Sequence, residues 1–129
     1  RADLTGADLK DADLKDADLT GADLTGADLK EIFKALPDVK NPDAQIIAAI
    51  EGGTGELHMG SWHECETTHC RAGWYVHQSG PAGKMLEAVY GCGPAGALIF
   101  AKAYPGRKVP NFFADDATAL ADIKANAAL

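Results

Sequence analysis

The sequence predicts a mixed fold, in which a short square coil of extended chain precedes a mainly α-helical domain. Residues 2–31 consist of six consecutive five-residue units that read Ala-Asp-Leu-x-x. A period of five fits neither the roughly 3.6-residue turn of a helix nor the alternation of a strand. Beyond this segment, short helical patterns alternate with Gly and Pro turns. The chain therefore divides into a repeat segment, residues 1–30, and a helical domain, residues 31–129.

The six repeat units determine the shape expected for the first segment. Their Ala and Leu can share one side only if the chain turns a corner at every unit, with both side chains pointing inward. Tandem units of this kind resemble the pentapeptide-repeat family, and six units in register make the resemblance highly specific. It implies a right-handed quadrilateral β-helix with Asp facing water. The implied interior residues are Ala2, Leu4, Ala7, Leu9, Ala12, Leu14, Ala17, Leu19, Ala22, Leu24, Ala27 and Leu29.

The family resemblance says less about function than about shape. Some family members resemble DNA in shape and charge and bind DNA gyrase, which requires a long acidic rod. Thirty residues at four units per coil make only about one and a half coils, whereas a stacked-repeat core needs several. Because the repeats begin at Arg1 inside the pattern, we expect a fragment of a longer coil, or a processed or engineered piece.

Composition and charge limit the partners that we expect. The 129 residues are 47% apolar and carry a net charge of −7. The first thirty hold −4 of it, with eight Asp against four Lys and Arg. This pattern lacks the clustered basic residues of a nucleic-acid surface, so we expect no nucleic-acid partner.

Apolar runs and cysteine content bear on location. No apolar run reaches the roughly 18 residues of a membrane helix, and the sequence shows no secretory signal. Three cysteines do not suggest a disulfide-dense secreted domain. These features predict no membrane partner and favour the cytoplasm.

The region after the repeats shows the start and stop signals of about five helices. Asn41 before Pro42 is a helix start, and Gly52-Gly53 is a stop. An amphipathic helix ending before Pro37 would cover the open end of the coil. We expect helices at 29–36, at 42–51, from about 68 to 76, from Pro81, from Pro94, and from 115 or 116 to about 127, with an extended piece at 56–59.

Two turn-rich segments are interpreted as connections. Gly91–Gly96 lacks the Lys and the Ser or Thr of a phosphate loop, so it predicts a junction between two helices. Tyr104–Phe113 contains two basic residues and predicts a loop that packs Phe112 and Phe113 on the core. A partner contact at this loop is an alternative.

The residues that could carry out chemistry are concentrated between His58 and His77. This window contains all four histidines and two of the three cysteines. One hypothesis is a zinc site, since thiolate and imidazole are natural zinc ligands. Its ligands would be His63, Cys65, His69 and Cys70, in a spacing that is not a common zinc pattern.

A second hypothesis makes Cys70 a catalytic nucleophile. If Thr68 caps a helix, Cys70 lies in its first turn, where the helix dipole and Arg71 lower a thiol pKa. His63 or His69 from the preceding loop would then act as the base.

The preferred interpretation is structural, with no catalytic residue, no cofactor and no metal. Cys is among the most frequently buried residues, and Cys70, Trp74 and His77 are spaced to share one helix face. Cys70 could also pair with Cys65 in a local disulfide, or meet Cys92 across a helical pair.

The window also contains a Cys-x-Thr-x-x-Cys-x-Ala-Gly-Trp stretch, from Cys65 to Trp74. It is similar to small helical regions of uncharacterised bacterial and phage proteins, a resemblance that carries no activity over. The sequence as a whole predicts a non-enzymatic structural or protein-interaction module that binds a protein partner or itself. The alternative is a cysteine- or zinc-dependent enzyme centred on Cys70.

Overall fold

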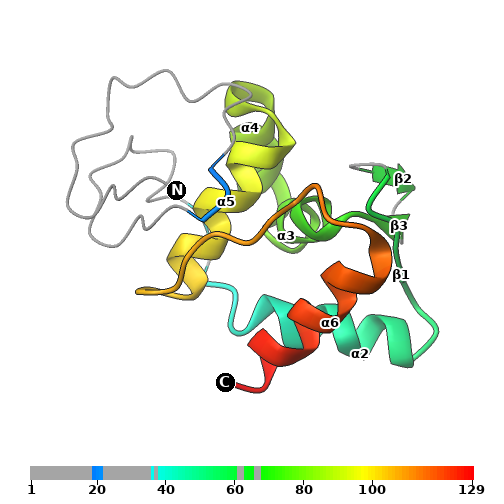
Figure 1. Ribbon diagram of the computed structural model, residues 1–129. Helices are drawn as coiled ribbons and strands as arrows, with labels where there is room; N and C mark the ends of the chain where they lie inside the picture. Colours follow the sequence, from blue (N-terminus) through cyan, green and yellow to red (C-terminus); the bar gives the residue numbers. More distant parts are fainter. Residues whose placement is uncertain (1–18, 22–35, 37, 61–62, 66–67) are drawn as a thin grey trace.

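Helices dominate the part of the chain that the structure, a computed structural model, describes (Figure 1). This part comprises residues 19–21, 36, 38–60, 63–65 and 68–129, with the backbone alone for residues 63–65 and 68. Within it lie five helices and a small sheet, so the predicted mainly helical domain is confirmed. The helices are α2 (Pro42–Glu51), α3 (Arg71–Gln78), α4 (Gly80–Tyr90), α5 (Cys92–Ala103) and α6 (Asp116–Ala127).

Two predictions concern residues outside this part. The quadrilateral β-helix of residues 2–31 lies outside the described residues, except for Leu19, Thr20 and Gly21. The helix expected at 29–36 also lies outside them, except for Leu36, which occupies a bend. Both therefore stay predictions.

The ends of α2 and α6 follow local capping chemistry, as the sequence predicts. Asn41 caps α2 by accepting a hydrogen bond from the Ala44 N–H, and Pro42 occupies the first turn, where no N–H is needed. Asp115 caps α6 by accepting the Thr118 N–H at 2.8 Å. The predicted limits of 42–51, and the start at 115 or 116, are confirmed.

The start of α3 differs from the prediction. Thr68 and His69 form β3, the central strand of a three-stranded sheet, parallel to β1 (Glu56–Leu57) and antiparallel to β2 (His63–Cys65). Pairing on both sides keeps this segment extended, so Cys70 rather than Thr68 is the N-cap of the helix. The sequence predicted only one part of this sheet, the extended piece at 56–59 that contains β1.

Gly91 separates α4 from α5, which confirms the predicted junction. Its φ of 90° lies in a region that L side chains rarely adopt, and the chain changes direction there. Pro81 and Pro94 both lie in first turns, as predicted, although α5 begins two residues before Pro94, at Cys92.

Helix α5 forms the centre of the core. Its residues from Pro94 to Phe100 are all buried, and it packs against α3 and α4, while α2 packs against α6 (Figure 1). Phe112 is buried as predicted, but Phe113 is 64% exposed, because the turn that carries both directs consecutive side chains apart. The prediction that both aromatics pack on the core is therefore wrong for Phe113.

The crossing of α3 and α5 is close enough to exclude a single methyl group. A Cβ added at Gly96 would lie 2.6 Å from the Ala72 Cβ and 2.8 Å from its Cα. Small residues at both positions therefore fix how near the two helices approach.

Replacing Gly96 should test this packing. Gly96→Ala should lower the free energy of unfolding by about 1–3 kcal/mol, because the two backbones must separate. The matched control is Gly60→Ala, whose Cβ meets nothing nearer than 3.8 Å and should change stability little. Urea unfolding of both variants checks this, and equal stabilities would contradict the packing argument.

Candidate functional site

Cys70 and Cys92 are the cysteines whose side chains the structure describes, and it brings them together. Cys70 caps α3, Cys92 is the first residue of α5, and both are buried thiols that are not part of a disulfide. The two side chains are joined by a hydrogen bond, and the Gly73 N–H donates to the Cys70 Sγ at 3.2 Å. The sequence named this pairing as one alternative, and the contact now supports it.

The two thiols have opposite electrostatic environments. The hydrogen bond from Cys92 lowers the pKa of Cys70, and the backbone N–H groups at the start of α3 lower it further against the effect of burial. The same hydrogen bond, burial and Glu87 raise the pKa of Cys92. Cys70 is therefore the thiol that loses its proton first, and Cys92 keeps one to donate.

His69, proposed as a base, belongs to a packed aromatic cluster. Its ring stacks on His77 with centroids 4.8 Å apart, and meets the edge of Trp74 at 4.9 Å. The indole of Trp74 donates to the Glu56 carbonyl at 2.9 Å, which ties the sheet to α3. The cluster contains Trp74 and His77 of the predicted helix face, whereas Cys70 contacts Cys92.

The zinc hypothesis involves residues that are only partly described. The backbones of His63 and His69 are paired in the sheet, but the side chains of His63 and Cys65 lie outside the described set. Among the described residues, no group of three or more His, Cys, Asp or Glu could hold a metal ion. The zinc ligands, and His63 as a catalytic base, therefore stay predictions.

A buried polar network links four helices, and sequence reasoning missed it. Asp43 accepts hydrogen bonds from the Arg71 guanidinium at 2.6 Å and the Tyr75 hydroxyl at 2.6 Å. The Asn126 amide also donates to Asp43, at 2.7 Å. Tyr104 accepts the Asp43 N–H at 3.0 Å and donates to the Asn41 Oδ1 at 2.6 Å. The network therefore joins α2 and α3 to α6 and the end of α5.

Arg71 is the charged centre of this network. It is 1% exposed, and it also donates to the Tyr75 hydroxyl at 2.8 Å and pairs with Asp122 at 2.5 Å. Burial alone would lower its pKa, but Tyr75 and Asp43 outweigh burial and raise it, so Arg71 stays charged. Its position directly after the N-cap gave no sign of burial in the sequence, because Arg is mostly an exposed residue.

Two contacts attach described residues of the repeat segment to the helical domain. The Gly21 N–H donates to the Val109 carbonyl at 2.7 Å, and Leu19 packs, half-buried, against the core. Val109 is itself buried, in the loop between α5 and α6. Gly21 therefore contacts the helical domain at the loop between α5 and α6, and the partner contact expected at this loop stays a prediction.

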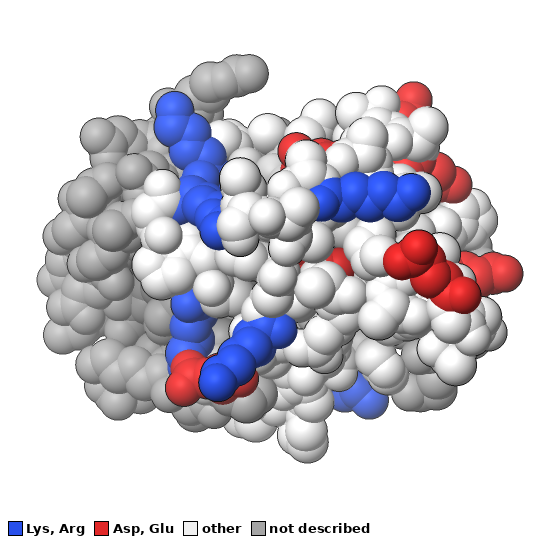
Figure 2. All heavy atoms as spheres, turned by 90° about the horizontal axis from the view of Figure 1, so that it is seen from below, with Lys and Arg blue, Asp and Glu red and all other residues white. Residues whose placement is uncertain are grey.

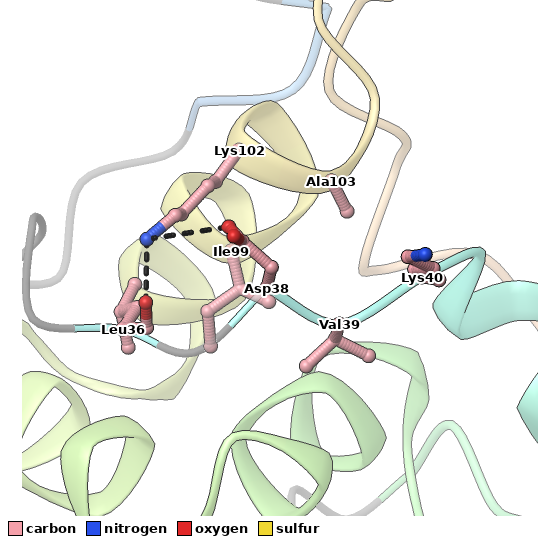
Figure 3. Close-up of a pocket in the computed structure, with 7 residues that line it drawn as sticks. All are labelled: Leu36, Asp38, Val39, Lys40, Ile99, Lys102 and Ala103. Atoms are coloured by element: carbon pink, nitrogen blue, oxygen red, sulfur yellow. Dashed lines mark hydrogen bonds and ion pairs between the residues drawn. The ribbon is translucent and has the colours of Figure 1, made fainter.

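The chain that leaves the repeats is also attached to α5. Lys102 donates to the Leu36 carbonyl at 2.5 Å and lies 3.9 Å from the Asp38 carboxylate (Figure 3). These residues line a cavity of about 160 Å³, smaller than the ~300–1,000 Å³ usual for small-molecule sites. We interpret it as a gap left where this segment crosses α5.

The charged side chains of the described residues bear on the kind of partner that the chain could bind. Figure 2 shows a face on which Lys and Arg are scattered among uncharged residues, with acidic side chains nearby.

Among the described residues, no helix is long and apolar enough to span a membrane.

Comparison with known proteins identifies the repeat segment. Residues 1–32 match a family model whose description is pentapeptide repeats, eight copies. This segment is therefore a pentapeptide-repeat segment. Pentapeptide repeats are generally structural or protein-interaction modules. No curated protein and no solved structure gave a significant match, so the similarity of Cys65–Trp74 to bacterial and phage proteins stays a prediction.

Removing Asp43 should show how strongly the fold depends on the network. Asp43→Ala leaves the buried guanidinium of Arg71 without its buried carboxylate partner and should cost about 3–5 kcal/mol of stability. The control is Asp122→Ala, which removes a carboxylate that is 60% exposed and should cost about 1 kcal/mol or less. Chemical denaturation distinguishes them, and equal losses would contradict the central role of Asp43.

The buried phenols should make the fold sensitive to alkali. Burial raises the pKa of Tyr104 to about 12, and it raises the pKa of Tyr75 well above 10. Because the unfolded chain loses these protons first, their stabilisation is complete below pH 10 and declines as pH rises towards 12. Urea unfolding across this range should show a shallower decline for Tyr104→Phe than for the unchanged chain. An equally steep decline would exclude Tyr104 as a cause.

Proposed function

We propose that this chain is a non-enzymatic structural or protein-interaction module, in which the helical domain caps the end of a pentapeptide-repeat coil. Two observations of one attachment carry the proposal: the Gly21 N–H donates to the Val109 carbonyl, and Leu19 packs against the core of the helical domain. It supports a role for the helical domain as a support for the repeats.

The physics of stacked repeats explains why such support is needed. A repeat coil exposes unpaired backbone groups and apolar interior at each end, and terminal units must cover both. In such a coil the hydrogen bond from Gly21 to Val109 would satisfy one of these backbone groups, and the core gives Leu19 an apolar surface. A short coil gains most from this contact, since it has few neighbouring coils to stack on.

The partner in this proposal is another protein or a second copy of the chain. The acidic repeats, with a net charge of −4, would offer one face, and the exposed Phe113 offers an apolar contact on the helical domain. Assembly through either face places the module in a larger complex.

The competing function, a cysteine enzyme, draws on one observation. Cys70 caps a helix, and its pKa is lowered by Cys92 and the backbone N–H groups. Its sulfur is hydrogen-bonded to Cys92 and to backbone N–H groups that include Gly73, and a thiol partner differs from the imidazole that a cysteine hydrolase uses. Rapid alkylation of Cys70 below neutral pH would favour the enzyme.

A charge placed at Leu19 should test the attachment. Leu19→Asp should destabilise the chain by about 1–3 kcal/mol, because it puts a carboxylate against the core. The control is Leu129→Asp, the same change at a residue that is 82% exposed. Thermal unfolding compares the two, and equal melting temperatures would show that the helical domain does not depend on this contact.

Separation of the two parts should show whether the helical domain caps the repeats. Residues 1–30 alone should aggregate or remain unfolded, whereas the full chain should be soluble. Circular dichroism and size-exclusion chromatography measure both properties. A soluble, monomeric, β-rich fragment would contradict the capping role.

A further inference from the structure

Two helix N-termini meet at one pair of sulfur atoms. Cys70 caps α3 and Cys92 begins α5, and their thiols are joined by a hydrogen bond in the core. The backbones beneath them are held in place by the close contact of Ala72 with Gly96. The sulfur atoms therefore remain neighbours as long as α3 and α5 stay packed.

The pair is chemically asymmetric. The Cys70 sulfur accepts the Gly73 N–H at 3.2 Å, at the positive end of α3, where negative charge is stabilised. The Cys92 thiol lies within hydrogen-bonding reach of both Cys70 and Glu87, so its single proton has two acceptors beside it. One sulfur is thus suited to attack and the other to follow, with a carboxylate beside it to receive a proton.

We propose that Cys70 and Cys92 form a peroxide-sensitive dithiol that closes to a reversible disulfide. The Cys70 thiolate attacks one oxygen of hydrogen peroxide, the O–O bond breaks, and hydroxide leaves. Cys70 is then a sulfenic acid. Cys92 attacks its sulfur as its own proton passes to Glu87, the S–O bond breaks, and the oxygen leaves as water once protonated. In sum, two thiols and one peroxide give a disulfide and two water molecules.

The oxidant must be small, because both thiols are buried, at 0% and 6% exposure. Hydrogen peroxide is little larger than water and needs only a brief local opening to reach Cys70. A bulky protein disulfide would require the helices to separate. Reduction by a small dithiol reverses the bond, so the pair can record oxidation without permanent damage.

A disulfide at this point would change the domain mechanically. It would close a loop that contains α3 and α4 and join their start to α5, restricting the unfolded chain. The oxidised chain should therefore melt several degrees above the reduced chain, by about 5 °C.

The experiment uses the full chain carrying Cys65→Ser, which removes the third cysteine. The reduced protein is treated with stoichiometric hydrogen peroxide, unfolded, alkylated and weighed by intact mass spectrometry. We expect a mass lower by two hydrogens, apart from one added oxygen for each oxidised Met, with no alkyl label and full recovery of both labels after dithiothreitol. Oxidation of Met85, which is 60% exposed, serves as the internal measure of peroxide dose.

The Cys92→Ser variant in the same background separates attack from resolution. Cys70 should then stop at the sulfenic acid and be trapped by dimedone, with circular dichroism confirming that the helices persist. The proposal is overturned if Met85 oxidises while both cysteines of the parent still take up label. It is also overturned if the disulfide forms only in denaturant, or if it lowers the melting temperature.

Discussion

The buried charge of Arg71 is the constraint on which the rest of the domain depends. Removing a guanidinium from water costs several kcal/mol, and that cost is offset only when its donors meet acceptors of opposite charge. Here Asp43 comes from α2, Tyr75 from the next turn of α3, and Asp122 from α6. The core is thus complete only when all three helices are in place, which favours one arrangement over looser ones.

The same helix start serves the cysteine pair. Because β3 holds Thr68 and His69 extended, the chain turns into α3 at Cys70, with Arg71 as its first helical residue. Consecutive residues therefore supply a sulfur to one cluster and a guanidinium to the other. A shift of the helix start by one residue would misplace the Cys70 sulfur and the Arg71 guanidinium. The small sheet, which sets that start, therefore positions both clusters.

The sequence predicted the elements whose limits are set locally. Asn41 with Pro42, and Asp115 before α6, determine helix starts through contacts within one turn, and Gly91 separates two helices through its own φ. The predicted start of α3 was wrong, because the position where this helix begins depends on pairing with a strand about twelve residues away. Such pairing leaves no local signal in the sequence.

The candidate site was predictable only in part. The concentration of Cys and His pointed to Cys70, and the contact with Cys92 was one alternative, offered as a meeting across a pair of helices. Asp43 and Arg71 could not be paired from the sequence, since 28 residues separate them and both types are normally exposed. Phe112 and Phe113 are equally apolar, so only the turn itself decides which is buried.

The hydrogen bond between Asn126 and Asp43 has a consequence for synthesis of the chain. These residues are 83 positions apart, so α2 leaves the ribosome well before its last partner exists. At about 5–20 residues per second, the gap is roughly 4 to 17 seconds. During that interval Arg71 and Tyr75 are already made and can pair with the Asp43 carboxylate, but the network lacks its Asn126 donor, which leaves the early helices loosely associated. Translation speed across α6 thus helps determine how long the nascent domain is open to chaperones.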